Sequence, residues 1–580
     1  MYDIVIENGL FFDGLGSIAV IRHLGIRDGI LVTISADLIQ EECIERIDAK
    51  GCWVTPGFID FHTHYDAEIE FDASLSESLR HGVTTIFLGS CSLGTAIGEP
   101  EDIADIFCRV EAVPRDVMLP MLKHTKNWKC FADYFQHLDN LPLGPNVTSF
   151  IGHSNVRMVA MGFERSVDPN IQPTEEELQN MEAMLEEGLD AGFVGMSVQT
   201  LPWDKLDGTR CRSQPLPSYF ASWSEYRRLT KILRRRGRIF QGVPNLVTKI
   251  NVLLFLWESV GIFRRPLKTT VISIMDLIAD RMIYFFVPIL ATIVNTVLRG
   301  DFRFQALPHL FDVWADGMDL VVFEEFGAGS EAMHLVDMGQ RKELLMDTDY
   351  RKRFRKQWDK MFSPRVYHRD FFRSEIKNCP DKSLIGRSFS DIAQEKNIHE
   401  VDAFLDLVAT YGTNIRWYSQ IANDRTKPLE HIVSHPSVLI GFSDAGAHLR
   451  NMAFYNFPLR LLRLVQEAKK RNEEFMSIEQ AVYRLTGEIG TWFQIDAGIL
   501  QEGRRADIVI VQPTELTEQL EAYEEDGIQG FGDFQRLVRR NPKAIPLVMV
   551  NGKIAVRNGD VVTSVGTEKG FGKVLRCDAR

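Results

Sequence analysis

The stretch "GFIDFHTHYDAEIEFD", Gly57 to Asp72, places two histidines two residues apart directly after an apolar run. The run reads as a buried strand, and residues i and i+2 of a strand point to the same face. His62 and His64 are therefore expected to face one cavity, where two imidazole nitrogens can bind a metal ion at about 2.0–2.1 Å. The alternative is that the two rings end a strand without binding anything.

The composition of the whole chain is that of a globular protein. Its 580 residues are 45% hydrophobic and 25% charged, and 79 acidic against 66 basic side chains give a net charge of −13. This acidic balance argues against a nucleic-acid partner, which would require a basic face. The cysteines are scattered without a CxxC pair, which suits a reducing compartment. The opening "MYDIVIENGL" shows no secretory signal, so we expect a cytoplasmic protein.

One apolar segment bears on this expectation. Met282 to Leu298, "MIYFFVPILATIVNTVL", runs without a charged residue and is at the short limit for a membrane span. Our interpretation is a helix that is buried or covered by another domain, since Pro288 and Asn295 interrupt the run. Association with a membrane surface is the alternative.

Both ends of the chain carry short strand-like runs broken by turns. The first 54 residues alternate apolar and polar positions, and Gly503 to Pro513 and Pro546 to Val562 repeat this pattern. We expect residues 1–54 and 491–580 to pair into one small β-sandwich. Residues 55–490 would form a second domain, with long insertions at about 245–435.

The middle of the chain alternates apolar strands with amphipathic helices such as Thr174–Ala191, the pattern of βα units around a parallel sheet. The predicted fold class is therefore α/β, a (β/α)8 TIM-type barrel. An eighth strand is expected at Asp319 to Gly327. The other predicted strands are "VTPGFIDFH", Val83–Cys91, Asn146–His153, Gly192–Gln199, Gly237–Val243, Leu267–Ile274 and Ser437–His448.

Asp444 ends the last predicted strand, in "LIGFSDAGAH". A carboxylate at the end of a barrel strand, followed by Gly446 and His448, is typical of a catalytic acid at the top of a barrel. Beside a metal, such a group can take a proton from an activated water and pass it to a leaving amine. The alternative role is the N-cap of a following helix.

Cys91 ends the second predicted strand and His153 the third. A thiolate is a good zinc ligand, although a lone cysteine is more often a small apolar core residue. His153 is a further polar candidate for the site at the same end of the predicted barrel. The sequence carries no GxGxxG after a strand, no GxxxxGK[ST] and no GxSxG that would indicate another chemistry.

These motifs together resemble the amidohydrolase superfamily, and within it the N-acyl-D-amino-acid deacylase (D-aminoacylase) branch. The resemblance spans nearly the whole chain and rests on "DIVIENGLFFDG", "VTPGFIDFHTHYD", "HGVTTIFLGSCSLG", "IGHSNVRMVAMGF", "IGFSDAGAH" and "GILQEGRRADIVIV". It implies a (β/α)8 barrel flanked by a β-sandwich built from both ends, zinc at the barrel mouth and hydrolysis of an amide.

The resemblance also implies roles for single residues. His62 and His64 match the metal ligands of the first strand, Cys91 matches a cysteine ligand, and Asp444 matches the general base and acid. Further histidine ligands are expected on strands five and six.

The chain departs from this pattern, since it has Gln241 on strand five and Thr269 or Thr270 on strand six, and no lysine on strand four. One Zn²⁺ ion is therefore expected rather than two, in a divergent subgroup. His153, Gln241 and His448 are candidates for additional metal or substrate contacts.

Three functions follow as hypotheses. The first is metal-dependent hydrolysis of a small linear amide of the N-acyl-D-amino-acid type. The second is hydrolysis of a cyclic amide, as in hydantoinases and dihydropyrimidinases, against which the missing strand-four lysine argues. The third is a catalytically silent scaffold, against which the retention of the ligand set argues. A homodimer is the default expectation for a soluble enzyme.

Overall fold

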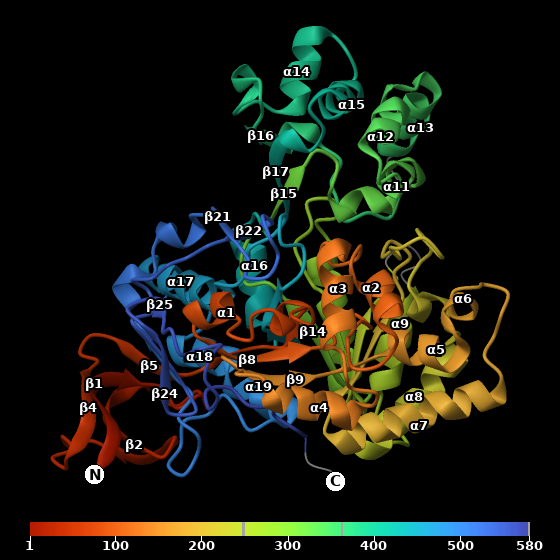
Figure 1. The fold of residues 1–580 in the computed structure, drawn as a ribbon. Helices are drawn as coiled ribbons and strands as arrows, with labels where there is room; N and C mark the ends of the chain where they lie inside the picture. The colour runs from red at the N-terminus through yellow and green to blue at the C-terminus, as the bar shows by residue number, and fades with distance from the viewer. Residues whose placement is uncertain (246–249, 361–362, 578–580) are drawn as a thin grey trace.

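The computed structural model describes residues 1–245, 250–360 and 363–577. A ring of parallel strands with helices around it forms the centre of the molecule, and a sheet made from both chain ends lies beside it (Figure 1). A third part, residues 307–423, projects from the ring as a separate lobe (Figure 1).

Parallel pairings connect the central strands in chain order. One sheet has the order β6-β8-β9, and a second has the order β10-β11-β12-β13-β14-β18. The short strands β7 and β19 pair with each other and close the ring between its first and last members, which is the arrangement that a (β/α)8 barrel requires. The strands are β6 (Phe58–Asp60), β7 (His62–Thr63), β8 (Val83–Leu88), β9 (Asn146–Ser149), β10 (Ile151–Gly152), β11 (Gly195–Gln199), β12 (Ile239–Val243), β13 (Lys268–Val271), β14 (Asp301–Ala306), β18 (Val438–Ile440) and β19 (Phe442–Ala445).

Helices cover the outside of this ring, and local sequence sets their ends. In α7, Thr174 and Glu177 form a capping box, and Gly192 ends the helix in the left-handed conformation, which confirms the predicted helix. The helices are α1 (Ser76–Arg80), α2 (Pro100–Phe107), α3 (Arg115–Thr125), α4 (Phe131–Asn140), α5 (His153–Met161), α6 (Phe163–Ser166), α7 (Glu175–Ala191), α8 (Trp223–Arg236), α9 (Ile250–Ser259), α10 (Ile283–Thr296), α16 (Thr426–Ser434), α17 (Phe457–Lys470), α18 (Ile478–Leu485) and α19 (Gly487–Phe493).

The two ends of the chain share one nine-stranded sheet, in which β5 from the first end pairs with β20 from the last. Asn551 and Gly552, both with positive φ, form the turn between β23 and β24, as the Asn-Gly pair predicts. The strands are β1 (Tyr2–Phe11), β2 (Val20–Arg27), β3 (Ile30–Ser35), β4 (Cys43–Asp48), β5 (Trp53–Pro56), β20 (Ile508–Val511), β23 (Leu547–Val550), β24 (Lys553–Arg557) and β25 (Asp560–Val561). A separate hairpin pairs β21 (Glu524–Gly527) with β22 (Gln535–Val538).

The projecting lobe has a hydrophobic core of its own, in which Phe323, Trp358, Phe404 and Trp417 pack together. The strand predicted at Asp319 to Gly327 is wrong, because that stretch forms a 3-10 helix and the start of α11 inside the lobe. The ring strand is β14 instead, in the earlier stretch "DFRFQA". The lobe contains β15 (Phe311–Asp316), α11 (Gly327–His334), α12 (Met338–Met346), α13 (Thr348–Trp358), β16 (Ser374–Asn378), α14 (Phe389–Lys396), α15 (Glu400–Tyr411) and β17 (Arg416–Ala422).

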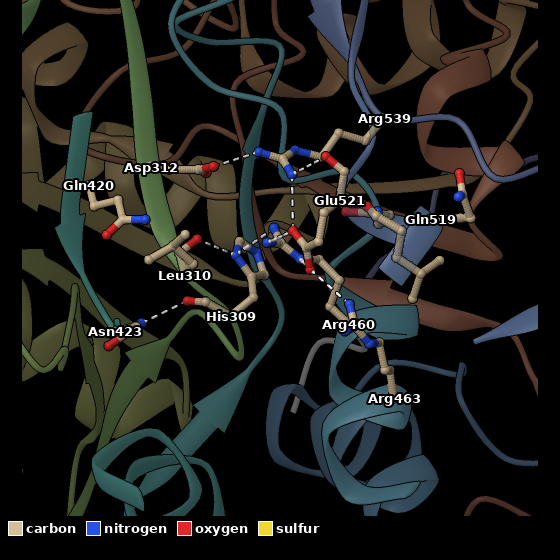
Figure 2. A network of polar contacts seen from close by, with 12 residues as sticks. His309, Leu310, Asp312, Gln420, Asn423, Arg460, Arg463, Gln519, Glu521 and Arg539 are labelled. Carbon is tan, nitrogen blue, oxygen red and sulfur yellow. Dashed lines mark hydrogen bonds and ion pairs between the residues drawn. The ribbon is translucent and has the colours of Figure 1, made fainter. Parts of the chain in front are cut away.

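A buried polar network ties the base of the lobe to the rest of the molecule (Figure 2). Arg539, from the C-terminal segment, donates to Asp312 in β15 at 2.7 Å and to Glu521 at 3.0 Å. Arg460 of α17 donates to the same Glu521 carboxylate at 3.2 Å and lies 2.8 Å from His309 Nδ1. Because each cation meets a carboxylate, the charges are compensated although the arginines are buried.

Helix α10 occupies the apolar segment noted in the sequence. The prediction that this segment is buried or covered is wrong, because one face of α10 is exposed, with Phe286 at 55% and Ile289 at 45%. Within the described residues, no helix combines the length and apolar composition needed to cross a bilayer.

Candidate functional site

Three buried side chains come together inside the ring at the ends of its first and second strands. His62 lies in β7, His64 follows it, and Cys91 lies in the loop after β8. Their nitrogen and sulfur atoms lie within 4.8 Å of one another, and His62 Nε2 is 3.2 Å from Cys91 Sγ. The structure thus assembles the three predicted ligands into one group.

Gln305 orients the first of these imidazoles. Its side-chain oxygen lies 2.6 Å from His62 Nδ1 and can only accept, so Nδ1 carries the proton. The lone pair of His62 is therefore on Nε2, the nitrogen that faces Cys91. Burial lowers the pKa of His62 to about 4, so the ring is neutral at physiological pH and able to bind a metal.

Glu111 lies behind the second imidazole. Its carboxylate oxygen is 3.3 Å from His64 Nδ1, although the two groups are not aligned for a hydrogen bond. The backbone carbonyl of Glu111 accepts from the His448 N–H at 2.6 Å, which joins this loop to the loop after β19. Burial, with the nearby charges of Asp444 and Asp204, raises the pKa of Glu111 well above its usual range.

The loop that carries Cys91 has an unusual backbone. Cys91 and Ser92 have φ values of 53° and 70°, in the left-handed region, and the Cys91 N–H donates to Gln241 Oε1 at 3.3 Å. The predicted contact residue Gln241 therefore reaches the site through the backbone of Cys91. Burial raises the pKa of the Cys91 thiol well above its usual value, so only a cation at the site would stabilise the thiolate.

Asp444 lies between the two imidazoles. Its Oδ1 atom is 3.5 Å from His62 Nε2 and 3.6 Å from His64 Nε2. Burial raises the pKa of Asp444 to about 7, and the charge of Asp204 adds to this effect. A carboxyl group that exchanges its proton near neutrality suits a general base.

The donor set fits a zinc ion. Two neutral imidazoles, a thiol and a nearby carboxylate are the ligand types that zinc prefers, and few ligands leave positions open for substrate. Gln305 supplies the outer hydrogen bond that a metal-binding histidine usually makes.

A cavity of about 480 Å³ opens beside this group. His448 and Asp204 line it, and the lobe contributes Leu320, Val321 and Glu324 to the lining. Arg109 in the lining donates to Glu324 at 3.1 Å. The predicted candidate His448 thus lines the cavity. Burial lowers the pKa of His64 well below its usual value, and the nearby charge of His448 adds to this effect.

Two other sequence candidates lie outside the group. His153 contacts Ser218 Oγ at 3.1 Å and Glu225 Oε1 at 3.1 Å, in a buried network of its own. Thr269 and Thr270 lie on β13 beside Gln241 and carry no group that replaces an imidazole. In the described residues, the only His/Cys/Asp/Glu group with metal-binding geometry is His62, His64 and Cys91.

Known proteins resemble this chain at two levels. An uncharacterized protein of Mycobacterium tuberculosis is 47% identical over 563 residues, which are 96% of this chain and 92% of that protein. The N-acyl-D-glutamate deacylase of Alcaligenes xylosoxydans xylosoxydans is 34% identical over 198 residues, 34% of this chain and 36% of the deacylase. No protein-family model matches the chain.

Solved structures resemble the whole chain. A D-aminoacylase with a binuclear metal center, studied for its one-metal activation and second-metal attenuation, superposes with a TM-score of 0.64. The identity is 18%, over 99% of this chain and 100% of that one. An N-acyl-D-glutamate deacylase from Bordetella bronchiseptica, in complex with zinc and a phosphonate inhibitor, gives 0.62 at 20% identity over 99% of both chains.

The chain is homologous to the mycobacterial protein over nearly its whole length, and it shares the fold of D-aminoacylases.

The described site contains residues that the sequence did not point to. Gln305 was missed because β14 was not recognised as a strand, although its position at the strand end would have identified it. Glu111 was missed because it comes from a loop, where no periodic pattern marks a buried carboxylate.

Proposed function

We propose that this protein hydrolyses the amide bond of a linear N-acyl amino acid, with one zinc ion held by His62, His64 and Cys91. The observation that carries the proposal is the position of Asp444, whose carboxylate lies 3.5 and 3.6 Å from the two imidazoles beside the cavity. A scaffold protein would need neither this carboxylate nor the ligand group. The strand-four segment, Gly195–Gln199, has no lysine, which supports a single ion over two.

Each polar group has a definite task in the reaction. Zinc, when bound, polarises the scissile carbonyl and lowers the pKa of the attacking water. Asp444 accepts the proton of that water and then donates it to the departing nitrogen, so the free amino acid and the carboxylic acid are released. Gln305 holds His62 with its Nε2 lone pair toward the site.

The cavity supports an amino-acid substrate. Arg109 and Arg450 in its lining are already paired with Glu324 and Asp316. Lys205 also lines the cavity, and in the described part of the chain it forms no ion pair within 4.0 Å. We assign Lys205 as the side chain that binds the carboxylate of the substrate. The D configuration follows the named relatives, which are a D-glutamate and a D-aspartate deacylase and a D-aminoacylase.

The same proposal covers the architecture around the site. Residues 55–490 would be a (β/α)8 barrel with its insertions, and residues 1–54 and 491–580 a composite β-sandwich. The scattered cysteines favour a reducing, cytoplasmic compartment.

This function is tested by measuring the release of free amino acid from a panel of N-acyl-D- and N-acyl-L-amino acids. The assay is run before chelation, after chelation and after zinc is restored. We expect turnover of N-acyl-D-amino acids that chelation abolishes and zinc restores. Opening of hydantoin or dihydrouracil in place of linear amides would establish the cyclic alternative. A protein that binds no zinc and cleaves neither class would be the scaffold.

A further inference from the structure

Helix α10 exposes an apolar stripe to the surroundings. Its members recur at three- and four-residue intervals and so lie on one face of the helix. Between 42% and 66% of each side chain is exposed. The stripe consists of Met282, Phe285, Phe286, Ile289, Leu290, Ile293 and Val297.

The polar side chains of α10 are hydrogen-bonded to backbone groups. Thr292 and Thr296 donate their hydroxyls to the carbonyls of Pro288 and Thr292, at 3.0 and 2.7 Å. Asn295 donates to the Phe302 carbonyl and accepts from the Phe302 N–H, both at 2.8 Å. Each of these side chains therefore has a partner within the protein, which lowers the cost of placing it near hydrocarbon.

The neighbouring helix α9 and the loop after it extend the apolar surface. Trp257 is 55% exposed, and Phe263 at the tip of the loop is fully exposed. The Gly261 N–H donates to the Leu298 carbonyl at 3.0 Å, so this loop lies against the end of α10. Exposed apolar side chains thus lie on α9, on the loop after it and on α10, and this loop contacts the end of α10.

Around Trp257 and Phe263, arginine side chains outnumber acidic side chains. Arg227, Arg234 and Arg264 all approach the buried carboxylate of Glu258, at 3.5, 3.1 and 3.9 Å. Two further cations, Arg265 and Arg299, are exposed, and in the described part of the chain neither makes an ion pair. The Arg264 guanidinium lies 5.7 Å from the centroid of the Trp257 ring. The surface is therefore apolar along its length and strongly basic where Trp257 and Phe263 lie.

We propose that this face, formed by α9, residues 260–265 and residues 282–299, binds peripherally to an anionic lipid surface. Phe263, Phe286 and the rest of the stripe would enter the boundary between headgroups and acyl chains, and the arginines would bind lipid phosphates. With 14 residues, α10 is about 21 Å long, which is shorter than a hydrocarbon core of about 30 Å, so it lies along the surface.

Charge favours a lipid surface over a second copy of the chain. A two-fold contact pairs one face with itself. The face offers a single acidic side chain, Glu258, which is 2% exposed and already shared by three arginines. Self-association would leave Arg265 and Arg299 without counter-charges, whereas an anionic bilayer supplies phosphates at that place.

Co-sedimentation of the full-length protein with phosphatidylcholine vesicles, with and without phosphatidylglycerol, tests the proposal without any substrate. Binding is expected to require phosphatidylglycerol and to weaken in high salt. Phe286→Glu and Phe263→Glu should each weaken it at least about tenfold. The double variant R265A/R299A should weaken it about 10- to 30-fold. The matched control is Phe372→Glu, because Phe372 in the lobe is also 55% exposed.

The possible results distinguish a lipid surface from a second copy of the chain as the partner of this face. Selective loss in the face variants, with unchanged thermal unfolding of Phe263→Glu, supports a lipid surface. Failure of the wild-type protein to sediment with either vesicle, or equal loss in Phe372→Glu, overturns the proposal. A concentration-dependent dimer that Phe286→Glu dissociates, without vesicle binding by the wild type, also overturns it and makes the face a subunit interface.

Discussion

Replacement of Gln305 tests how the site holds its metal. In Gln305→Leu, the acceptor 2.6 Å from His62 Nδ1 is lost and the ring can rotate or change tautomer. Such an outer hydrogen bond contributes about 10- to 100-fold to metal affinity, which is about 1.4 to 2.8 kcal/mol. Competition with a zinc chelator of known affinity measures this change directly.

Two further variants make the Gln305 experiment specific. Gln305→Glu retains an acceptor at the same place, so we expect zinc affinity equal to or above that of the wild type. Thr270→Val, on the buried strand between those of Gln241 and Gln305, removes a hydroxyl that makes no hydrogen bond, so affinity should not change. Zinc affinity of Gln305→Leu within twofold of the wild type would refute the proposed orientation of His62.

Three more predictions follow from the same geometry. Zinc affinity should rise from pH 6 to pH 8. Burial raises the pKa of the Cys91 thiol well above its usual value and the pKa of Asp444 to about 7. Zinc stabilises the anionic form of both groups, so binding is stronger at the pH where less proton must be displaced. Protonation of His62 does not affect zinc affinity in this range, because its pKa is lowered to about 4. A zinc affinity independent of pH would contradict the ligand assignment. Cys91→Ser should weaken zinc binding more than Gln305→Leu does, in the same chelator competition, because it removes a ligand rather than its support. Lys205→Met should raise KM about tenfold or more with little change in kcat, because it removes a charged contact to the substrate carboxylate; steady-state kinetics in which kcat alone falls would show a different role.

The sequence was sufficient to identify the parts of the site that sit at strand ends. His62, Cys91 and Asp444 follow mainly apolar, buried stretches, and the ring topology brings such strand ends together whatever the intervening sequence. Gln305 escaped notice because β14 alternates polar and apolar residues, as an edge strand would, although both of its neighbours are ring strands.

The position of Glu111 and the exposure of α10 depend on tertiary contacts, which local sequence patterns do not reveal. Glu111 reaches His64 from a loop whose position depends on contacts such as that of its carbonyl with the His448 N–H. The apolar composition of α10 predicted a buried or covered helix, but several of its apolar side chains are exposed. Composition does not say whether the environment is the protein interior or its surroundings, and here one face is exposed.

Amide hydrolysis by zinc-loaded Asp444→Asn tests the central claim most directly. Asparagine keeps the shape of the side chain but cannot accept the proton of the attacking water. We expect kcat to fall about 10²- to 10⁴-fold while the zinc content stays at one ion per chain. Turnover close to that of the wild type, at full zinc content, would contradict the role of Asp444 and with it the proposed mechanism.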